Sequence, residues 1–184
     1  AGIRDASNLA WKITYCLKNK HDNKILNTYQ SERFSNVKEY IETTMRMGEF
    51  VNAVENTQIT KNISSGNDGI KSMQSIKPKL GSGLGEKKDK RRGKIFPQFK
   101  LKNGKNLDDK FSVKPILLYS SDINKTLSNK FNSIDSRNIP GLLSYLNNFG
   151  VKAVIVRPDR FILSSIKSRN SFKKFLKKNS NFLV

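Results

Sequence analysis

The first twenty residues of the chain constrain its fold most, because their apolar residues recur every three or four positions. That spacing places apolar side chains on one face of an α-helix, so residues 1–20 are predicted to be an amphipathic helix. The residues of this apolar face are Ile3, Ala6, Leu9, Ala10, Ile13 and Leu17. Asp5 lies in the first turn, where a carboxylate complements the helix dipole. The pattern fits an ordinary amphipathic helix, and it also fits a helix whose N-terminus binds an anionic or carbonyl-bearing ligand.

The segment from Gly2 to Lys12, GIRDASNLAWK, resembles the pattern G-[IL]-[QR]-D-A-x-N-L-x-W-K of the FAD-dependent aromatic-ring hydroxylases. These single-component flavin monooxygenases include the phenol hydroxylases and the 3-(3-hydroxyphenyl)propionate hydroxylases. The similarity is ungapped and continues in register through Leu26-x-x-Tyr29-x-x-Glu32-Arg33 and Arg46-Met47-Gly48. In the family this helix follows the flavin-binding motifs. The resemblance therefore implies that the chain is the C-terminal part of a longer hydroxylase.

The resemblance implies an oxidoreductase that uses FAD, with NAD(P)H as co-substrate, and O2 to hydroxylate a small phenolic or other aromatic substrate. The backbone amides at the helix N-terminus would face the pyrimidine carbonyl of the flavin, and two polar side chains would fix this turn. The implied FAD-binding residues are Ala1, Gly2, Ile3, Asp5 and Asn8. No catalytic residue is identifiable in the chain. We therefore expect the isolated chain to be inactive, to bind FAD weakly or not at all, and to expose the helix face that packs on the flavin domain.

Glu32 and Arg33 have two interpretations. The resemblance favours an arrangement in which Arg33 ties the second helix to the flavin domain through a carboxylate, with Asp5 as a candidate. The alternative is a solvated pair on the surface of a helix, which contributes little to stability. In neither interpretation is either residue expected to be catalytic.

The composition of the chain predicts three parts. Residues 1–55 are expected to hold two helices, over 1–20 and about 24–53, that end the FAD-binding domain in the family. Residues 56–94 are rich in Gly, Ser, Asn and Lys and are predicted to be a flexible basic linker. Residues 95–184 return to an ordered pattern. Its expected elements are a strand over 113–119, helices over 122–131 and 140–148, a hairpin of strands over 151–156 and 161–163, and a helix over 168–178.

This order of strand, helix, hairpin and terminal helix is typical of the C-terminal half of a thioredoxin-like fold. The predicted class is therefore α+β, with an N-terminal helical segment followed by a thioredoxin-like domain. The landmarks F-P-Q, L-D-D and V-R-P-D, which begin at Phe96, Leu107 and Val156, also resemble the small C-terminal domain of the same hydroxylases. The family usually has Gly where Arg160 stands, so the hairpin turn is expected to differ. This domain lacks redox cysteines in the family, and it is expected to serve packing or subunit contact, including contact in a homodimer.

The formal net charge of +20 is typical of a nucleic-acid binder when it is taken alone. The excess consists mostly of Lys scattered among Asn, Ile and Ser, as A/T-rich codon usage would produce, so nucleic acid is not the expected partner. Two alternative functions remain open. One is a basic protein that binds nucleic acid or an anionic surface, and the other is a non-catalytic thioredoxin-like interaction module.

The single cysteine, Cys16, and the single histidine, His21, exclude the usual His/Cys zinc sets, so no metal is expected. Cys16 is interpreted as a small buried residue. No apolar run approaches the roughly 20 residues that a membrane-spanning helix needs. The chain also begins without the zones of a signal peptide, so a cytoplasmic protein is expected.

Overall fold

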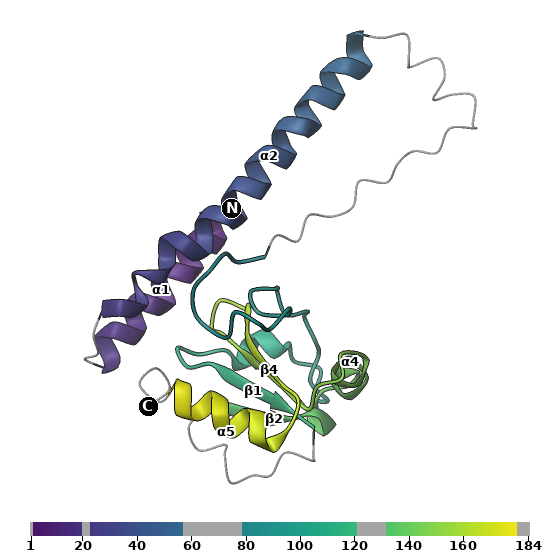
Figure 1. Cartoon of the computed structure of the whole chain (residues 1–184). Coiled ribbons are helices and arrows are strands. Elements are labelled where there is room, and N and C mark those ends of the chain that lie inside the picture. Colours follow the sequence, from purple (N-terminus) through teal and green to yellow (C-terminus); the bar gives the residue numbers. More distant parts are fainter. Residues whose placement is uncertain (1, 20–22, 57–78, 121–131, 180–184) are drawn as a thin grey trace, which may run out of the picture.

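The computed structural model describes residues 2–19, 23–56, 79–120 and 132–179. Two long helices begin the chain, α1 (Gly2–Asn19) and α2 (Thr28–Asn56), and the short 3-10 helix η1 (Asn23–Ile25) precedes α2. α1 lies alongside the first half of α2, while the second half of α2 extends away from the rest of the molecule (Figure 1). None of the described helices is both long and apolar enough to span a membrane.

Four strands form one mixed sheet in the order β2-β1-β3-β4. The strands are β1 (Ile116–Tyr119), β2 (Asn132–Asp135), β3 (Ala153–Val156) and β4 (Ile162–Ile166). β1 pairs in parallel with β2 and antiparallel with β3, and β3 pairs antiparallel with β4. β3 is buried along its whole length because its sequence AVIV is apolar on both faces.

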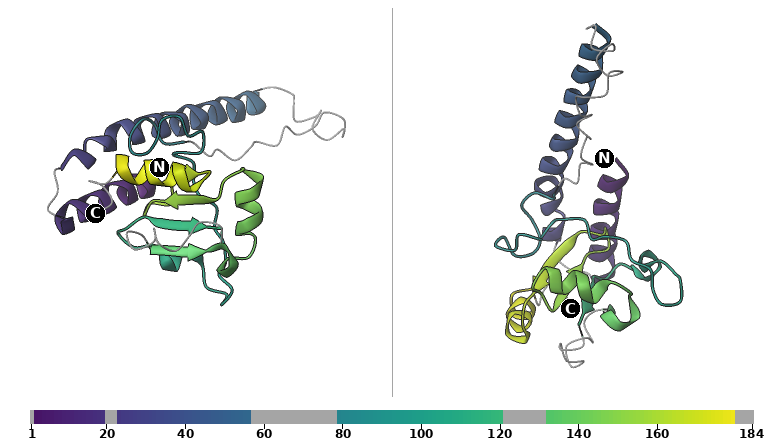
Figure 2. Two further views of the ribbon diagram at one scale, coloured as in Figure 1. Left: turned by 60° about the horizontal axis from the view of Figure 1, so that its bottom comes forward. Right: turned by 90° about the vertical axis from the view of Figure 1, so that its right-hand side faces the viewer.

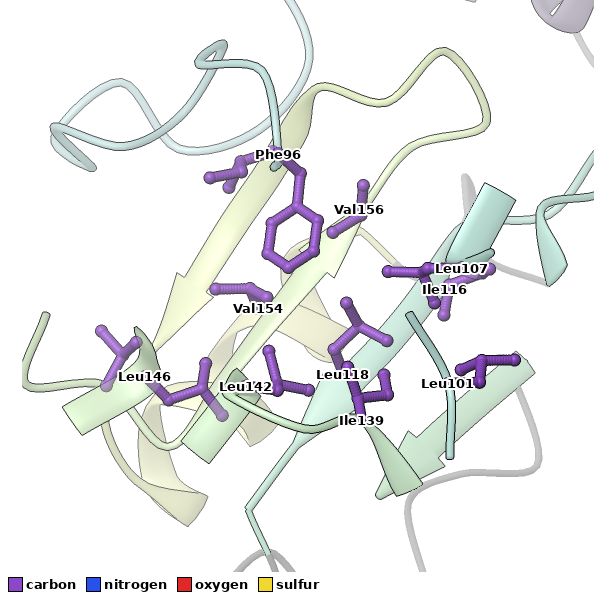
Figure 3. Packing of buried hydrophobic residues seen from close by; sticks show 12 residues of the cluster. Phe96, Leu101, Leu107, Ile116, Leu118, Ile139, Leu142, Leu146, Val154 and Val156 are labelled. Atoms are coloured by element: carbon purple, nitrogen blue, oxygen red, sulfur yellow. The ribbon is translucent and has the colours of Figure 1, made fainter. Parts of the chain in front are cut away.

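Helices cover both faces of the sheet (Figure 2). α4 (Leu142–Asn148) packs on one face, together with the 3-10 helix η2 (Leu107–Lys110). Figure 3 shows this core, in which Phe96, Leu118, Leu142 and Val154 are among the contributing side chains. α5 (Arg169–Lys178) packs on the other face through Phe172 and Phe175, and Leu176 is partly buried beside them.

The α+β class is confirmed, and most of the expected elements are present with ends shifted by a few residues. α5 begins where it was predicted, because the Ser168 side chain accepts a hydrogen bond from the Ser171 amide and forms a reciprocal capping box with it. β2 was not predicted. Its sequence NSID is polar and only half-buried, so it carries no apolar pattern. The helix expected over 122–131 lies outside the described residues.

The segment 79–94 packs against α2 and β4, which differs from the flexible linker predicted there. The Gly81 amide donates to the Glu32 carbonyl at 2.8 Å, and the Gly93 amide donates to the Ile162 carbonyl at 2.8 Å. Arg92 closes the loop by donating to the Gly81 and Leu84 carbonyls. Composition alone suggested flexibility, but here glycine permits close backbone approach. The other part of the predicted linker, 57–78, is outside the described residues, and the division of the chain into three parts stays a prediction.

Arg160 occupies the hairpin turn with φ of 70°, a conformation that glycine adopts without strain. Arg160 therefore adopts a backbone region that Gly favours, and the expected difference in turn type stays a prediction. The Arg160 side chain holds this turn through an ion pair with Asp108 and a hydrogen bond to the Phe96 carbonyl at 3.2 Å. These contacts offset the cost of the left-handed backbone.

Candidate functional site

α1 buries one face and leaves its predicted apolar face outside. Ile3, Ile13 and Leu17 are 90%, 42% and 76% exposed. The buried residues lie on the opposite side, at the three- and four-residue steps of a helix. They are Asn8, Trp11, Lys12, Tyr15 and Cys16. The apolar face is thus exposed in this chain, as the resemblance led us to expect, and Cys16 is buried as interpreted.

Glu32 of α2 is fully buried and lies at the centre of a network of charged side chains. Its carboxylate accepts hydrogen bonds from Lys12 Nζ at 2.9 Å and from both terminal nitrogens of Arg157 at 2.8 and 2.9 Å. It also accepts from the Leu84 amide at 2.8 Å and from Asn8 Nδ2 at 3.3 Å. Both carboxylate oxygens are therefore saturated by donors from α1, the 79–94 segment and the β3–β4 turn.

Arg157 and Asp159 of the V-R-P-D sequence complete this network from the β3–β4 turn. Arg157 donates to Asp159 through Nε at 3.0 Å and through Nη2 at 2.7 Å, and its guanidinium lies 5.1 Å from the centroid of the Trp11 ring. Asp159 also accepts from Asn8 Nδ2 at 2.8 Å. We call Asn8, Lys12, Glu32, Arg157 and Asp159 the buried charge network. It ties α1 to the C-terminal sheet.

The network balances two cations against two carboxylates, and this balance decides the protonation states. Burial alone raises the pKa of Glu32, but the charges and hydrogen bonds of Arg157 and Lys12 outweigh it and lower that pKa. Burial lowers the pKa of Lys12, and Glu32 opposes this only in part. Burial also lowers the pKa of Arg157, but Asp159 and Glu32 more than reverse the effect and raise it.

The predicted FAD-binding residues do not all have the same surroundings. Gly2 and Ile3 are exposed at the N-terminus of α1, where the first backbone amides have no partner within the helix. Asp5 accepts a hydrogen bond from Arg33 Nε at 2.5 Å, and Asn8 is buried in the network. Ala1 lies outside the described residues. Asp5 and Asn8 thus fix the first two turns of α1 on α2, and FAD binding by all five residues stays a prediction.

The ion pair between Arg33 and Asp5 that the resemblance favoured is confirmed. The alternative, a solvated surface pair, is wrong, because Glu32 is 0% and Arg33 only 3% exposed. Arg33 keeps two more donors. Among the described residues, neither Nη1 nor Nη2 of Arg33 has a hydrogen-bond partner, and both are buried. The carbonyl-type oxygen of Asn8 is likewise buried without a partner in the described part of the chain.

Sequence patterns alone did not assign Lys12, Arg157 or Asp159 to a site. Lys12 was part of the W-K pair in the first motif, and the other two belong to V-R-P-D. The available signal was the position of these charged residues next to apolar residues of helices and strands. A charged side chain is buried in such a place only when it is paired, so each of them could have been expected to have a partner. The partner of each charge could not be derived from the sequence. Arg157 and Glu32, for example, are 125 positions apart in the chain.

The lowered pKa of Glu32 predicts that the chain loses stability in acid. Between the folded pKa and the ordinary value of 4.5, the unfolded chain binds a proton at this carboxylate and the folded chain does not. The stabilisation is therefore complete above the ordinary pKa and is lost as the pH falls through the folded value. Urea unfolding at pH values from about 6 to 3 measures this. Glu32→Gln should flatten the acid limb, and an equally steep limb in that variant would contradict the assignment.

The sequence model of the FAD binding domain family matches residues 1–44, which include α1 and the first part of α2. No curated protein matches the chain. Solved structures that share its fold do so at low sequence identity, as three of them show. OxyS anhydrotetracycline hydroxylase from Streptomyces rimosus has a TM-score of 0.54 at 18% identity, over 96% of this chain and 39% of that one.

The flavin-dependent monooxygenase PieE, solved with FAD and substrate, has a TM-score of 0.69 at 15% identity, over 95% of this chain and 42% of that one. Aklavinone-11 hydroxylase, solved with FAD and aklavinone, has a TM-score of 0.57 at 13% identity, over 97% of this chain and 39% of that one. The chain therefore spans 39–42% of the length of these structures. The resemblance to the FAD-dependent aromatic hydroxylases is thus confirmed: residues 1–44 carry the sequence pattern of the FAD binding domain family, whose cofactor is FAD, and the chain has the fold of the matching part of flavin-dependent hydroxylases.

Proposed function

We propose that the chain is the C-terminal part of an FAD-dependent monooxygenase that hydroxylates a phenolic or other aromatic substrate with NAD(P)H and O2. The observation that supports this most directly is the family match over residues 1–44, which includes the whole of α1. The N-terminus of α1 is exposed and open, since a Cβ added at Gly2 would meet nothing within 4 Å. That end of the helix can therefore be approached closely by a ligand or by another part of the protein.

The residues present could contact FAD at one place, the first turn of α1. FAD, when bound, supplies the redox and oxygen chemistry of the reaction. The exposed amides at Gly2 and Ile3, and at Ala1 by sequence, would stabilise negative charge on a ring carbonyl placed at this positive helix end. Asp5 and Asn8 would hold the turn through Arg33 and the buried charge network. In this proposal the chain contributes orientation and electrostatics, and no side chain of it transfers a proton.

The rest of the flavin domain would cover the exposed face of α1. An apolar stripe that includes Ile3, Ile13 and Leu17 is unfavourable in water, and a protein surface packed against it would remove this cost. The isolated chain would then be inactive and would bind FAD weakly or not at all, because most contacts to the cofactor belong to the part that it lacks.

We also propose that residues 95–184 form a thioredoxin-like domain without redox cysteines. The sheet order β2-β1-β3-β4, with a parallel β1–β2 pair and an antiparallel β3–β4 hairpin followed by α5, supports this topology. Its place in the proposed enzyme is to hold α1 through Arg157 and Asp159. A cytoplasmic location and a homodimer are also parts of the proposal.

The reading frame upstream of Ala1 tests the proposal first. We expect an in-frame G-x-G-x-x-G, a Gly-Asp motif and a G-x-G-M-N segment that ends at Ala1. The extended chain should then purify with the visible absorbance of bound flavin, whereas the 184-residue chain titrated with FAD should show no saturable quenching of flavin fluorescence. Asn8→Ala in the extended chain should weaken FAD retention more than Glu42→Ala on the exposed side of α2.

Two results would reject the proposal. A natural start codon near Ala1 with no flavin motif before it would remove the parent enzyme. Tight, saturable FAD binding by the 184-residue chain alone would show that the cofactor site does not need further sequence.

A further inference from the structure

An open cavity of about 590 Å³ lies on the C-terminal sheet domain, and the buried charge network does not contribute to it. Its walls come from the 79–94 segment, the end of α4, β4 and the start of α5. Five cationic side chains and two acidic ones line it. The cations are Lys88, Lys90, Arg91, Lys94 and Lys167. A cavity with this excess of positive charge favours an anionic occupant.

Asp89, one of the two acidic residues, is already used by the backbone. Its Oδ2 accepts from the Ser165 amide at 2.5 Å, and its Oδ1 accepts from the Arg91 amide at 2.9 Å. These bonds fix the loop on β4. The carboxylate keeps its negative charge, so the five cationic and two acidic side chains of the lining carry a net formal charge of +3. None of the four lysines forms an ion pair with another residue in the described part of the chain.

Arg91 contacts two other residues of the cavity wall, Phe149 and Ser165. Its guanidinium lies 5.0 Å from the centroid of the Phe149 ring, and it donates to the Phe149 carbonyl and to Ser165 Oγ. Because Ser165 Oγ accepts from Arg91, its own O–H can donate into the cavity. The Phe149 side chain is 38% exposed and adds an apolar surface beside these donors. Such preorganised donors lose little conformational entropy when they bind a ligand.

The same positive charge acts on Lys79, which lies beside the cavity and donates to the Lys90 carbonyl at 3.1 Å. Burial lowers the pKa of Lys79, and the charges of Arg92 and Lys94 lower it further, against the weaker opposing effect of Asp89. The charges of Arg92 and Lys94 therefore disfavour the charged form of Lys79 in the absence of a ligand. A multiply charged anion would oppose this effect.

We propose that this cavity binds a small phosphate-bearing anion with at least two negative charges. Phosphate oxygens would accept from the lysine ammonium groups and from the Ser165 hydroxyl. The cations surround one concavity and are not arranged along a stripe, which favours a compact ligand over a nucleic-acid backbone. Inorganic phosphates and nucleotides share this chemistry, and the exposed Phe149 ring distinguishes them, because only a nucleotide has a base to pack against it. This site is independent of the proposed monooxygenase.

Isothermal titration of the 184-residue chain with inorganic pyrophosphate, at constant ionic strength, tests the site. We expect saturable binding that the double variant Lys90→Ala/Lys167→Ala weakens by about tenfold or more. The matched control is Lys102→Ala/Lys110→Ala, which removes the same charge from a separate cavity beside β2 and should change the affinity less than about twofold. Circular dichroism of each variant verifies that it is folded.

A second arm uses adenosine 5′-diphosphate with Phe149→Leu. Weaker binding of the nucleotide with unchanged pyrophosphate binding would assign the site to nucleotides, and no change for either would assign it to inorganic phosphates. The proposal is overturned if pyrophosphate does not saturate, or if both lysine double variants weaken binding equally. It is also overturned if a single-stranded oligonucleotide binds more tightly than pyrophosphate and the control variant weakens that binding as much, since an extended basic surface would then explain the data.

Discussion

Glu32→Gln is expected to lower the free energy of unfolding of the chain by about 3–5 kcal/mol. Glutamine has nearly the same shape, but it removes the negative charge that Lys12 and Arg157 share inside the protein. It also brings an NH2 group, which only donates hydrogen bonds, into a position that is surrounded by donors. At least one of its hydrogens must therefore face another donor group. The remaining carboxylate, Asp159, then faces two buried cations. Urea unfolding measures the change, and Trp11, the only tryptophan, reports on it because Arg157 lies over its ring.

The matched control for this variant is Glu42→Gln on the same helix. Glu42 pairs with Lys38 at 3.7 Å, and both side chains are more than half exposed. Exposed pairs of this kind contribute about 0.5 kcal/mol or less. A small and equal loss of stability in both variants would contradict the central place of Glu32. It would mean that water screens the carboxylate in solution.

Gly81→Ala is expected to lower the free energy of unfolding by about 2–3 kcal/mol. A Cβ at this position would lie well under 3.0 Å from the Ser31 carbonyl oxygen, which is backbone and cannot rotate away. The loop would have to leave α2 and lose the bond from the Gly81 amide to the Glu32 carbonyl. The Leu84 amide, which donates to the Glu32 carboxylate, belongs to the same loop and would be displaced with it. Thermal unfolding followed by circular dichroism measures the loss.

Gly48→Ala supplies the matched control for the glycine variant. Gly48 lies in the exposed half of α2, and a Cβ there would meet nothing within 4 Å. Alanine has the higher helix propensity, so this variant should gain about 0.5–1 kcal/mol. If Gly81→Ala also stabilised the chain, the segment 79–94 would be a flexible linker after all, as its composition had suggested.

The sequence determined those features that depend on neighbouring residues. Helical periodicity predicted α1 and α2, the continuous apolar run predicted β3, and Ser168 marked the start of α5. Each of these signals is local, because helix and strand periods and helix caps involve residues within about four positions of one another. The resemblance of Gly2 to Lys12 added the expected cofactor and the exposed face of α1, and it did so through recognition of a pattern.

Only the tertiary structure decided the contacts that hold the candidate site. Nothing in the local sequence says that Glu32 would meet Arg157 across 125 positions, or that Asn8 would meet Asp159 across 151. The polar strand β2 and the packed loop at Gly81 were missed for a related reason. Their structure comes from a partner segment, β1 in one case and α2 in the other, and their own residues carry only polar and glycine-rich composition. The pairing of buried charges that are distant in the sequence depends on the tertiary structure. A buried charge is stable only when the fold places an oppositely charged partner next to it.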